Sequence, residues 1–240
     1  MVLSPEPGPL VVPGRFNGPP AGANGGYACG LLAGAAAGHL DGPPQVALHL
    51  PVPLDTPLEY EKAGRRGHAY ARGDLVATVS TARRAVPPVE PVPAEAAATA
   101  HEGFAGRSGH PFPTCFVCGT DRPGDGLGLT PGPAGPPGTV ACVWTPSAAL
   151  AAPGGRVPAE IVWGALDCPG GWTGDLVAEP RVLASMSARI EALPRAGRRH
   201  VIVGRRVGVA GRTATTATAL YDAEGVLLAG ALANWVTVAG

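Results

Sequence analysis

Two groups of residues in this 240-residue chain have the types needed to act on a carbonyl compound. The first is Asn24-Gly25-Gly26-Tyr27, which we expect at the start of a helix, with Asn24 as its N-cap. Backbone N–H groups there lack intrahelical acceptors and carry a partial positive charge, and glycine leaves them open to a ligand. We predict that Gly25, Gly26 and Tyr27 form the binding site for a carbonyl oxygen, with the N–H of Gly26 or Tyr27 as the donor. Asn24 could hold the same oxygen or a water. The alternative is a capped turn with no further role.

The second group centres on Asp167, the strongest candidate for a general base or a nucleophile. It follows the apolar run 161–166, and we expect it near the end of a helix. Burying a carboxylate is costly, and a helix C-terminus disfavours negative charge, so both effects would raise the pKa of Asp167 towards neutrality. The alternative is a solvated loop residue. Glu160 is more simply explained as a favourable acid in the first helical turn.

A pair of cysteines, Cys115-x-x-Cys118, could be half of a zinc site or a redox pair. A structural zinc ion needs four ligands, and the chain has no second such pair. His101, His110 and Asp121 leave a mixed site open, but we predict a loop with free thiols, no metal and no cofactor. The three other cysteines are expected in the core: Cys29, Cys142 and Cys168.

The elements that must position these residues occur twice in the same order, which predicts an α+β fold with two similar halves. The first half has a helix over 27–38 and strands over 45–52, 57–63, 67–72 and 74–83. The second has a strand over 139–144, a helix over 158–167 stopped by Pro169-Gly170-Gly171, and strands over 182–193, 199–209, 213–221 and 226–238. We divide the chain into an N-terminal half (1–95), a linker with the cysteine pair (96–125) and a C-terminal half (126–240).

Composition limits the classes of partner. Lys plus Arg and Asp plus Glu both total 18, so no charge excess points to nucleic acid or to an anionic membrane. The N-terminus has no signal-peptide pattern, and the chain has no apolar run of about 18 residues. We therefore expect a soluble cytoplasmic protein whose five cysteines are reduced.

Several motifs resemble those of acyl-CoA thioesterase-like proteins with a double hotdog fold. Residues 22–27 are similar to the His-Gly-Gly turn of that family, with Asn24 in the His place. The other matching motifs are 115–119 followed by 126–129, 162–172, and the strand corner 51–54. The resemblance covers about 14–238. It implies two fused hotdog halves, each an antiparallel sheet wrapped around a central helix, that mimic the dimer of single-hotdog proteins.

The resemblance also implies a site across the interface between the two halves. Only the first half has the glycine turn, and only the second has a carboxylate on its helix, so we predict one composite site in which Asn24-Gly25-Gly26 faces Asp167. The expected activity is hydrolysis of an acyl-CoA or acyl-carrier thioester by a monomeric pseudo-dimer or a homo-oligomer. A non-catalytic acyl-thioester or small-ligand binding protein and a hydratase or dehydratase are the alternatives.

Four further residues are candidates for substrate binding. Trp163 and Trp172 could line a tunnel for the acyl or pantetheine group, or serve only in packing. Arg205 and Arg206 belong to an arginine-rich segment that could hold the phosphates of coenzyme A, because arginine binds phosphate in a bidentate way. The alternative for this segment is a solvated strand edge that prevents aggregation.

Overall fold

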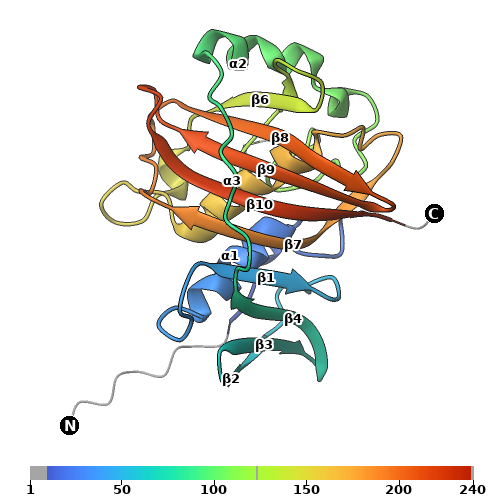
Figure 1. Ribbon diagram of the computed structural model, residues 1–240, viewed down its shortest axis with the longest axis vertical. Helices are drawn as coiled ribbons and strands as arrows, with labels where there is room; N and C mark the ends of the chain where they lie inside the picture. The colour runs from blue at the N-terminus through green and yellow to red at the C-terminus, as the bar shows by residue number, and fades with distance from the viewer. Residues whose placement is uncertain (1–9, 123, 239–240) are drawn as a thin grey trace.

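One large antiparallel sheet is the central element of the fold. The computed structural model describes residues 10–122 and 124–238. The sheet has the order β2-β3-β4-β1-β7-β10-β9-β8-β6-β5 (Figure 1). Its strands are β1 (Pro44–Leu48), β2 (Glu59–Ala63), β3 (Arg66–Ala71), β4 (Asp74–Thr81), β5 (Gly132–Pro133), β6 (Thr139–Trp144), β7 (Arg181–Ile190), β8 (His200–Ala210), β9 (Thr213–Tyr221) and β10 (Leu227–Thr237).

The two halves of the chain meet in this sheet at β1 and β7. The two strands pair antiparallel, with Gln45 opposite Ser187, Val46 opposite Met186 and Ala47 opposite Ser185. Val46 and Met186 are fully buried, so the junction is also part of the hydrophobic core. The α+β class is therefore confirmed, while the residue boundaries of the two halves and the linker stay predictions.

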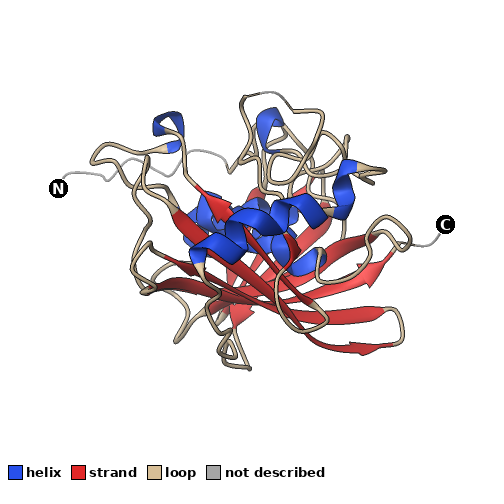
Figure 2. Ribbon diagram, turned by 90° about the horizontal axis from the view of Figure 1, so that it is seen from above, coloured by secondary structure: helices blue, strands red, loops and turns tan. Residues whose placement is uncertain are grey.

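Two central helices lie against one face of the curved sheet, α1 (Gly25–Ala35) and α3 (Ala159–Gly171) (Figure 2). They cross at unusually short range because α1 has glycine where α3 touches it. A β-carbon at Gly26 would lie 2.4 Å from Cβ of Asp167, and one at Gly30 would lie 2.6 Å from Cα of Glu160. The contacts run from Asp167 back to Glu160 as α1 advances, so the helices are antiparallel.

Helix α1 begins as its sequence predicts. The side-chain oxygen of Asn24 accepts the backbone N–H of Tyr27 at 2.9 Å, which satisfies one of the free donors of the first turn. The helix starts two residues earlier than predicted and ends at Ala35 rather than Gly38.

Helix α3 corrects a prediction, because Pro169-Gly170-Gly171 does not stop it. The helix continues through Pro169 to Gly171, and Trp172 is its C-cap. The two glycines bring this last turn against the sheet: a β-carbon at Gly170 would lie 2.7 Å from Oγ1 of Thr216, and one at Gly171 would lie 2.8 Å from the ring of Trp235. This packing outweighs the helix-breaking tendency of proline and glycine.

The other face of the sheet is covered by the segment that joins the halves. Residues 82–93 cross β10, β9 and β8 in Figure 1 and lead to the short helix α2 (Ala94–Ala100) above β6. The hydroxyl of Tyr221 on β9 donates to the carbonyl of Val89. A small second core lies under this segment and consists of Val89, Ala97, Ala141, Val201, Val203, Ala217, Ala219 and Tyr221.

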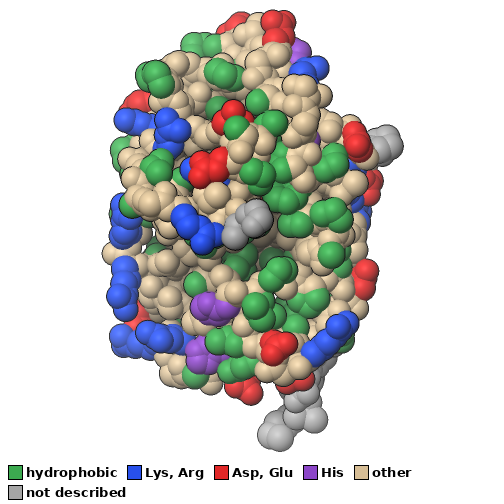
Figure 3. Space-filling view, turned by 90° about the vertical axis from the view of Figure 1, so that its right-hand side faces the viewer, with side chains coloured by type: hydrophobic (Ala, Val, Ile, Leu, Met, Phe, Trp, Pro, Cys, Tyr) green, Lys and Arg blue, Asp and Glu red, His purple; other side chains and the backbone are tan. Residues whose placement is uncertain are grey.

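Acidic and basic side chains both occur on the face seen in Figure 3, with basic residues along one margin and hydrophobic residues across much of the middle. Within residues 10–122 and 124–238, the helices are too short or too polar for any of them to cross a membrane.

Candidate functional site

A cavity of about 250 Å³ lies where the start of α1, the end of α3, β7 and the loop containing Cys115 and Cys118 come together. Both halves of the chain contribute to its wall. Its lining residues that can form hydrogen bonds or react include Asn24, Gly25, Cys115, Asp167, Trp172 and Arg181. Most of the remaining wall is apolar, with Leu48, Val52, Leu176 and Leu183 among its residues.

Asp167 lies in this cavity wall and is 2% exposed. Its Oδ2 accepts the backbone N–H of Gly26 at 2.9 Å and a side-chain N–H of Asn24 at 3.0 Å. Its Oδ1 is buried and has no hydrogen-bond partner among the described residues. The structure therefore brings Asp167 and Asn24-Gly25-Gly26 together, with one carboxylate oxygen fixed and the other unpaired.

The pKa of Asp167 is raised to about 7. Burial is the largest cause, because it removes water from the charged form, and the nearby Cys115 adds to the effect. The hydrogen bonds from Gly26 and Asn24 oppose it. The pKa of Asp167 is raised, as the sequence predicts, but the end of the helix is not the cause. Because α3 continues for four residues beyond Asp167, burial is the main explanation.

The backbone N–H groups at the start of α1 differ in whether they already have a hydrogen-bond acceptor. The N–H of Tyr27 is taken by Asn24 and that of Gly26 by Asp167. The N–H of Gly25 has no acceptor among the described residues, and Gly25 lines the cavity. Of the three predicted residues, Gly25 is therefore better placed to bind a carbonyl oxygen than Gly26 or Tyr27. The Tyr27 ring stacks on Phe16, with ring centroids 3.9 Å apart.

Asn24 helps to hold Asp167 in place, because it donates to the same carboxylate oxygen as Gly26. It is 2% exposed, and both ends of its amide are occupied, since Oδ1 caps α1 while Nδ2 donates to Asp167. In this arrangement Asn24 orients Asp167 and is not free to hold a water or a carbonyl oxygen.

The predicted substrate-binding residues fall into two groups. Trp172 lines the cavity and packs edge-on against Phe104 and His110. Trp163 is buried beside α1 at a different hollow, and Arg205 and Arg206 are exposed on β8; none of these three lines the cavity.

Sequence reasoning missed Arg181, which does line the cavity, is 8% exposed and bonds to Glu179. Its position at the start of the apolar strand β7 was the available signal.

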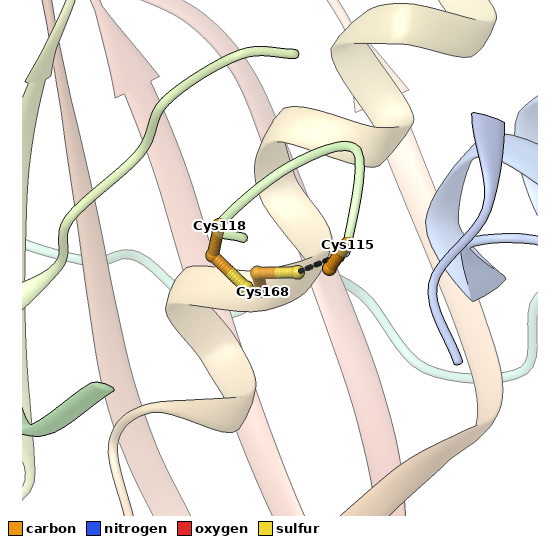
Figure 4. Close-up of side chains that lie close together, drawn as sticks. All are labelled: Cys115, Cys118 and Cys168. Atoms are coloured by element: carbon orange, nitrogen blue, oxygen red, sulfur yellow. Dashed lines mark hydrogen bonds between the residues drawn. The ribbon is translucent and has the colours of Figure 1, made fainter. Parts of the chain in front are cut away.

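Three cysteines meet at one side of the cavity (Figure 4). Cys115 and Cys118 come from the loop, Cys168 comes from α3, and all three sulfur atoms lie within 4.8 Å of one another. Cys168 is buried as predicted, but it does not lie apart from the cysteine pair. The pKa of the Cys115 thiol is lowered well below its ordinary value, because Cys118 and Cys168 both act as hydrogen-bond donors to its sulfur.

The loop that carries Cys115 and Cys118 is held through Phe116, which lies between the two cysteines. The N–H of Phe116 donates to the carbonyl of Asn17 at 2.8 Å, and the carbonyl of Phe116 accepts the N–H of Leu127 at 2.8 Å. The turn closes when the N–H of Gly119 donates to the carbonyl of Cys115 at 2.9 Å. A β-carbon at Gly119 would lie 2.5 Å from that oxygen, so only glycine fits there.

Comparison with known proteins identifies the fold. No protein-family model and no curated protein sequence matches the chain. Among solved structures, a proposed thioesterase of Novosphingobium aromaticivorans matches with a TM-score of 0.58 at 17% identity, over 95% of this chain and 94% of its own. The tesB protein of Mycobacterium avium subspecies paratuberculosis matches with a TM-score of 0.54 at 12% identity, over 89% of this chain and 85% of its own. The chain has a double hotdog fold.

The two helix ends of this double hotdog are not equivalent. Asp167 is the ninth residue of α3 and contacts Gly26, the second residue of α1. At the opposite end, the ninth residue of α1 is Ala33, and the second residue of α3 is Glu160. Both of these line a second hollow, beside Trp163. Only the end with Asp167 combines a buried carboxylate with a glycine turn.

Proposed function

We propose that this double hotdog protein is a hydrolase for acyl thioesters of the acyl-CoA class. One observation carries the proposal: a buried carboxylate of α3, with one oxygen unpaired, lies against the glycine-rich start of α1 in the wall of an apolar cavity. A general base and a site for negative charge on a carbonyl oxygen are the two requirements of thioester hydrolysis.

The reaction uses these groups in order. Oδ1 of Asp167 takes a proton from water as the water oxygen attacks the thioester carbonyl. The carbonyl oxygen accepts the N–H of Gly25, where the partial positive charge of α1 stabilises the developing oxyanion. The carbon–sulfur bond then breaks, and the proton held by Asp167 passes to the leaving thiolate. Asn24 and the N–H of Gly26 keep Oδ2 in place, so that Oδ1 faces the reacting atoms.

The cavity suggests which acyl groups fit. A volume of about 250 Å³ and a largely apolar wall suit a short or medium hydrocarbon or aromatic acyl group. Trp172 forms part of this wall. Coenzyme A and a carrier protein present the same pantetheine thioester, so both belong in the first substrate panel.

The test is thiol release from a panel of acyl-CoA thioesters. Asp167→Asn keeps the size of the side chain but removes the base, and we expect kcat to fall at least about 100-fold. Asn24→Ser keeps a helix-capping oxygen but removes the amide N–H that Asp167 accepts, and we expect kcat to fall with little change in KM. Glu160→Gln is the matched control, because Glu160 is the carboxylate at the other end of α3. The activity of this variant should equal that of the unmodified protein.

Two results would overturn the proposal. The first is full turnover in Asp167→Asn. The second is acyl-CoA binding without thiol release by the unmodified protein, which would favour the non-catalytic binding alternative. Because His110 also lines the cavity, the panel includes enoyl-CoA thioesters, and hydration of one without thiol release would favour the hydratase alternative.

A further inference from the structure

The cysteine cluster has the dimensions of a metal site. Zinc–sulfur bonds of about 2.3 Å in a tetrahedron place two sulfur atoms about 3.8 Å apart. The sulfur atoms of Cys115 and Cys168 are 3.8 Å apart, and Cys118 completes a triangle in which no sulfur–sulfur distance exceeds 4.8 Å. The three side chains point toward one another in Figure 4.

The surroundings of the cluster favour bound thiolates. The amide nitrogen Nδ2 of Asn24 lies 3.9 Å from Sγ of Cys115 and 3.8 Å from Sγ of Cys168. The loop places two cysteines three residues apart in a tight turn closed by Gly119, a spacing common among zinc ligands. All three cysteines are buried and reduced, so a cation would be shielded from bulk water.

We propose that Cys115, Cys118 and Cys168 bind one zinc ion, with a fourth coordination position open to the cavity. Protein zinc sites with three protein ligands keep the fourth position for water or a substrate. All three cysteines line the cavity, so a small ligand there can reach that position. The site also links the loop of the joining segment to α3 one residue after Asp167. The zinc proposal does not rest on the proposed hydrolase activity.

The first experiment measures metal binding without reference to activity. Reduced, metal-free protein is titrated with cobalt(II), which takes the place of zinc and gives a thiolate-to-cobalt charge-transfer band in the near ultraviolet. We expect one cobalt ion per chain, intense visible bands of tetrahedral coordination, and displacement of cobalt by zinc. Serine variants of Cys115, Cys118 and Cys168 should each lose this spectrum. Cys142→Ser should keep it, because Cys142 is buried in β6 outside the cluster.

A second measurement uses only the unmodified protein, so that misfolding of a variant cannot decide the result. X-ray absorption at the zinc edge should show three sulfur ligands at about 2.3 Å and one lighter ligand. Any of three results would overturn the proposal: no cobalt spectrum, an unchanged spectrum in the three serine variants, or a zinc-edge spectrum without sulfur ligands. None of them bears on the outcome of the thiol-release assay.

Discussion

The close crossing of α1 and α3 predicts opposite effects for the same substitution at two glycines of one helix. Gly30 is buried where the helices cross, and a β-carbon there would lie 2.6 Å from Cα of Glu160 and 2.9 Å from Cβ of Trp163. Gly34, one turn later, is exposed, and a β-carbon there would have no other atom within 4 Å among the described residues. Gly30→Ala and Gly34→Ala therefore differ only in what the new methyl group meets.

The expected magnitudes follow from the two environments. Alanine is better than glycine in a helix by roughly 0.5–1 kcal/mol, and Gly34→Ala should gain about that much in free energy of unfolding. At Gly30 a clash outweighs the same gain in helix stability, because extra atoms in a packed core typically cost about 1–3 kcal/mol. The nearest atom, Cα of Glu160, belongs to the backbone and cannot move aside as a flexible side chain can. We expect a net loss of roughly 1–3 kcal/mol for Gly30→Ala.

Urea unfolding followed by circular dichroism measures both changes. A shift of the midpoint at constant slope reports stability alone. In a chain of this size, about 1 kcal/mol corresponds to roughly 2–4 °C in Tm, so thermal melts should place the two variants on opposite sides of the unmodified protein. Equal stability of Gly30→Ala and Gly34→Ala would refute the close crossing, and with it the approach of Asp167 to Gly26.

Three more predictions concern stability. In metal-free protein, the pKa of Asp167 is higher in the folded state (about 7) than in the unfolded state (about 4), so the free energy of unfolding falls as pH rises between these values. Asp167→Asn should remove this pH dependence and raise the free energy of unfolding at pH 8 by up to about 4 kcal/mol. Equal pH profiles of the two proteins in urea unfolding would contradict this expectation. Gly119→Ala should lower the free energy of unfolding by roughly 1–3 kcal/mol, because the turn has no room for a methyl group, and an unchanged urea midpoint would count against the described turn. Tyr221→Phe should lose the bond to Val89 and about 0.5–1.5 kcal/mol, with faster proteolysis in 82–93, whereas unchanged cleavage would argue against that anchor.

Much of the fold was predictable because it depends on local patterns. The bounds of β6 and β9 agree with the prediction to the residue, since both strands alternate small and β-branched residues between clear turns. The N-cap role of Asn24 is a local property of the same kind. The end of α3 was not predictable, because its last turn is stabilised by Thr216 and Trp235 from strands far along the chain.

The candidate site was predictable in its central pair and less so around it. The pairing of Asp167 with the glycine turn follows from the complementary halves, and the structure brings them into contact. Which N–H groups remain free depends on how the carboxylate and Asn24 bond in three dimensions. The joining of Cys168 to Cys115 and Cys118 depends on contacts between segments far apart in the chain, which spacing in the sequence does not reveal.

Because the segment after β4 joins the two halves covalently, both central helices belong to one polypeptide, and this has an evolutionary consequence. In an assembly of two identical subunits, every substitution occurs twice, so a residue needed at one helix end is imposed on the other. A duplicated gene removes that constraint. Here Asp167 is present at one end while Ala33 takes the matching position at the other, so mutation can alter either end without changing its counterpart.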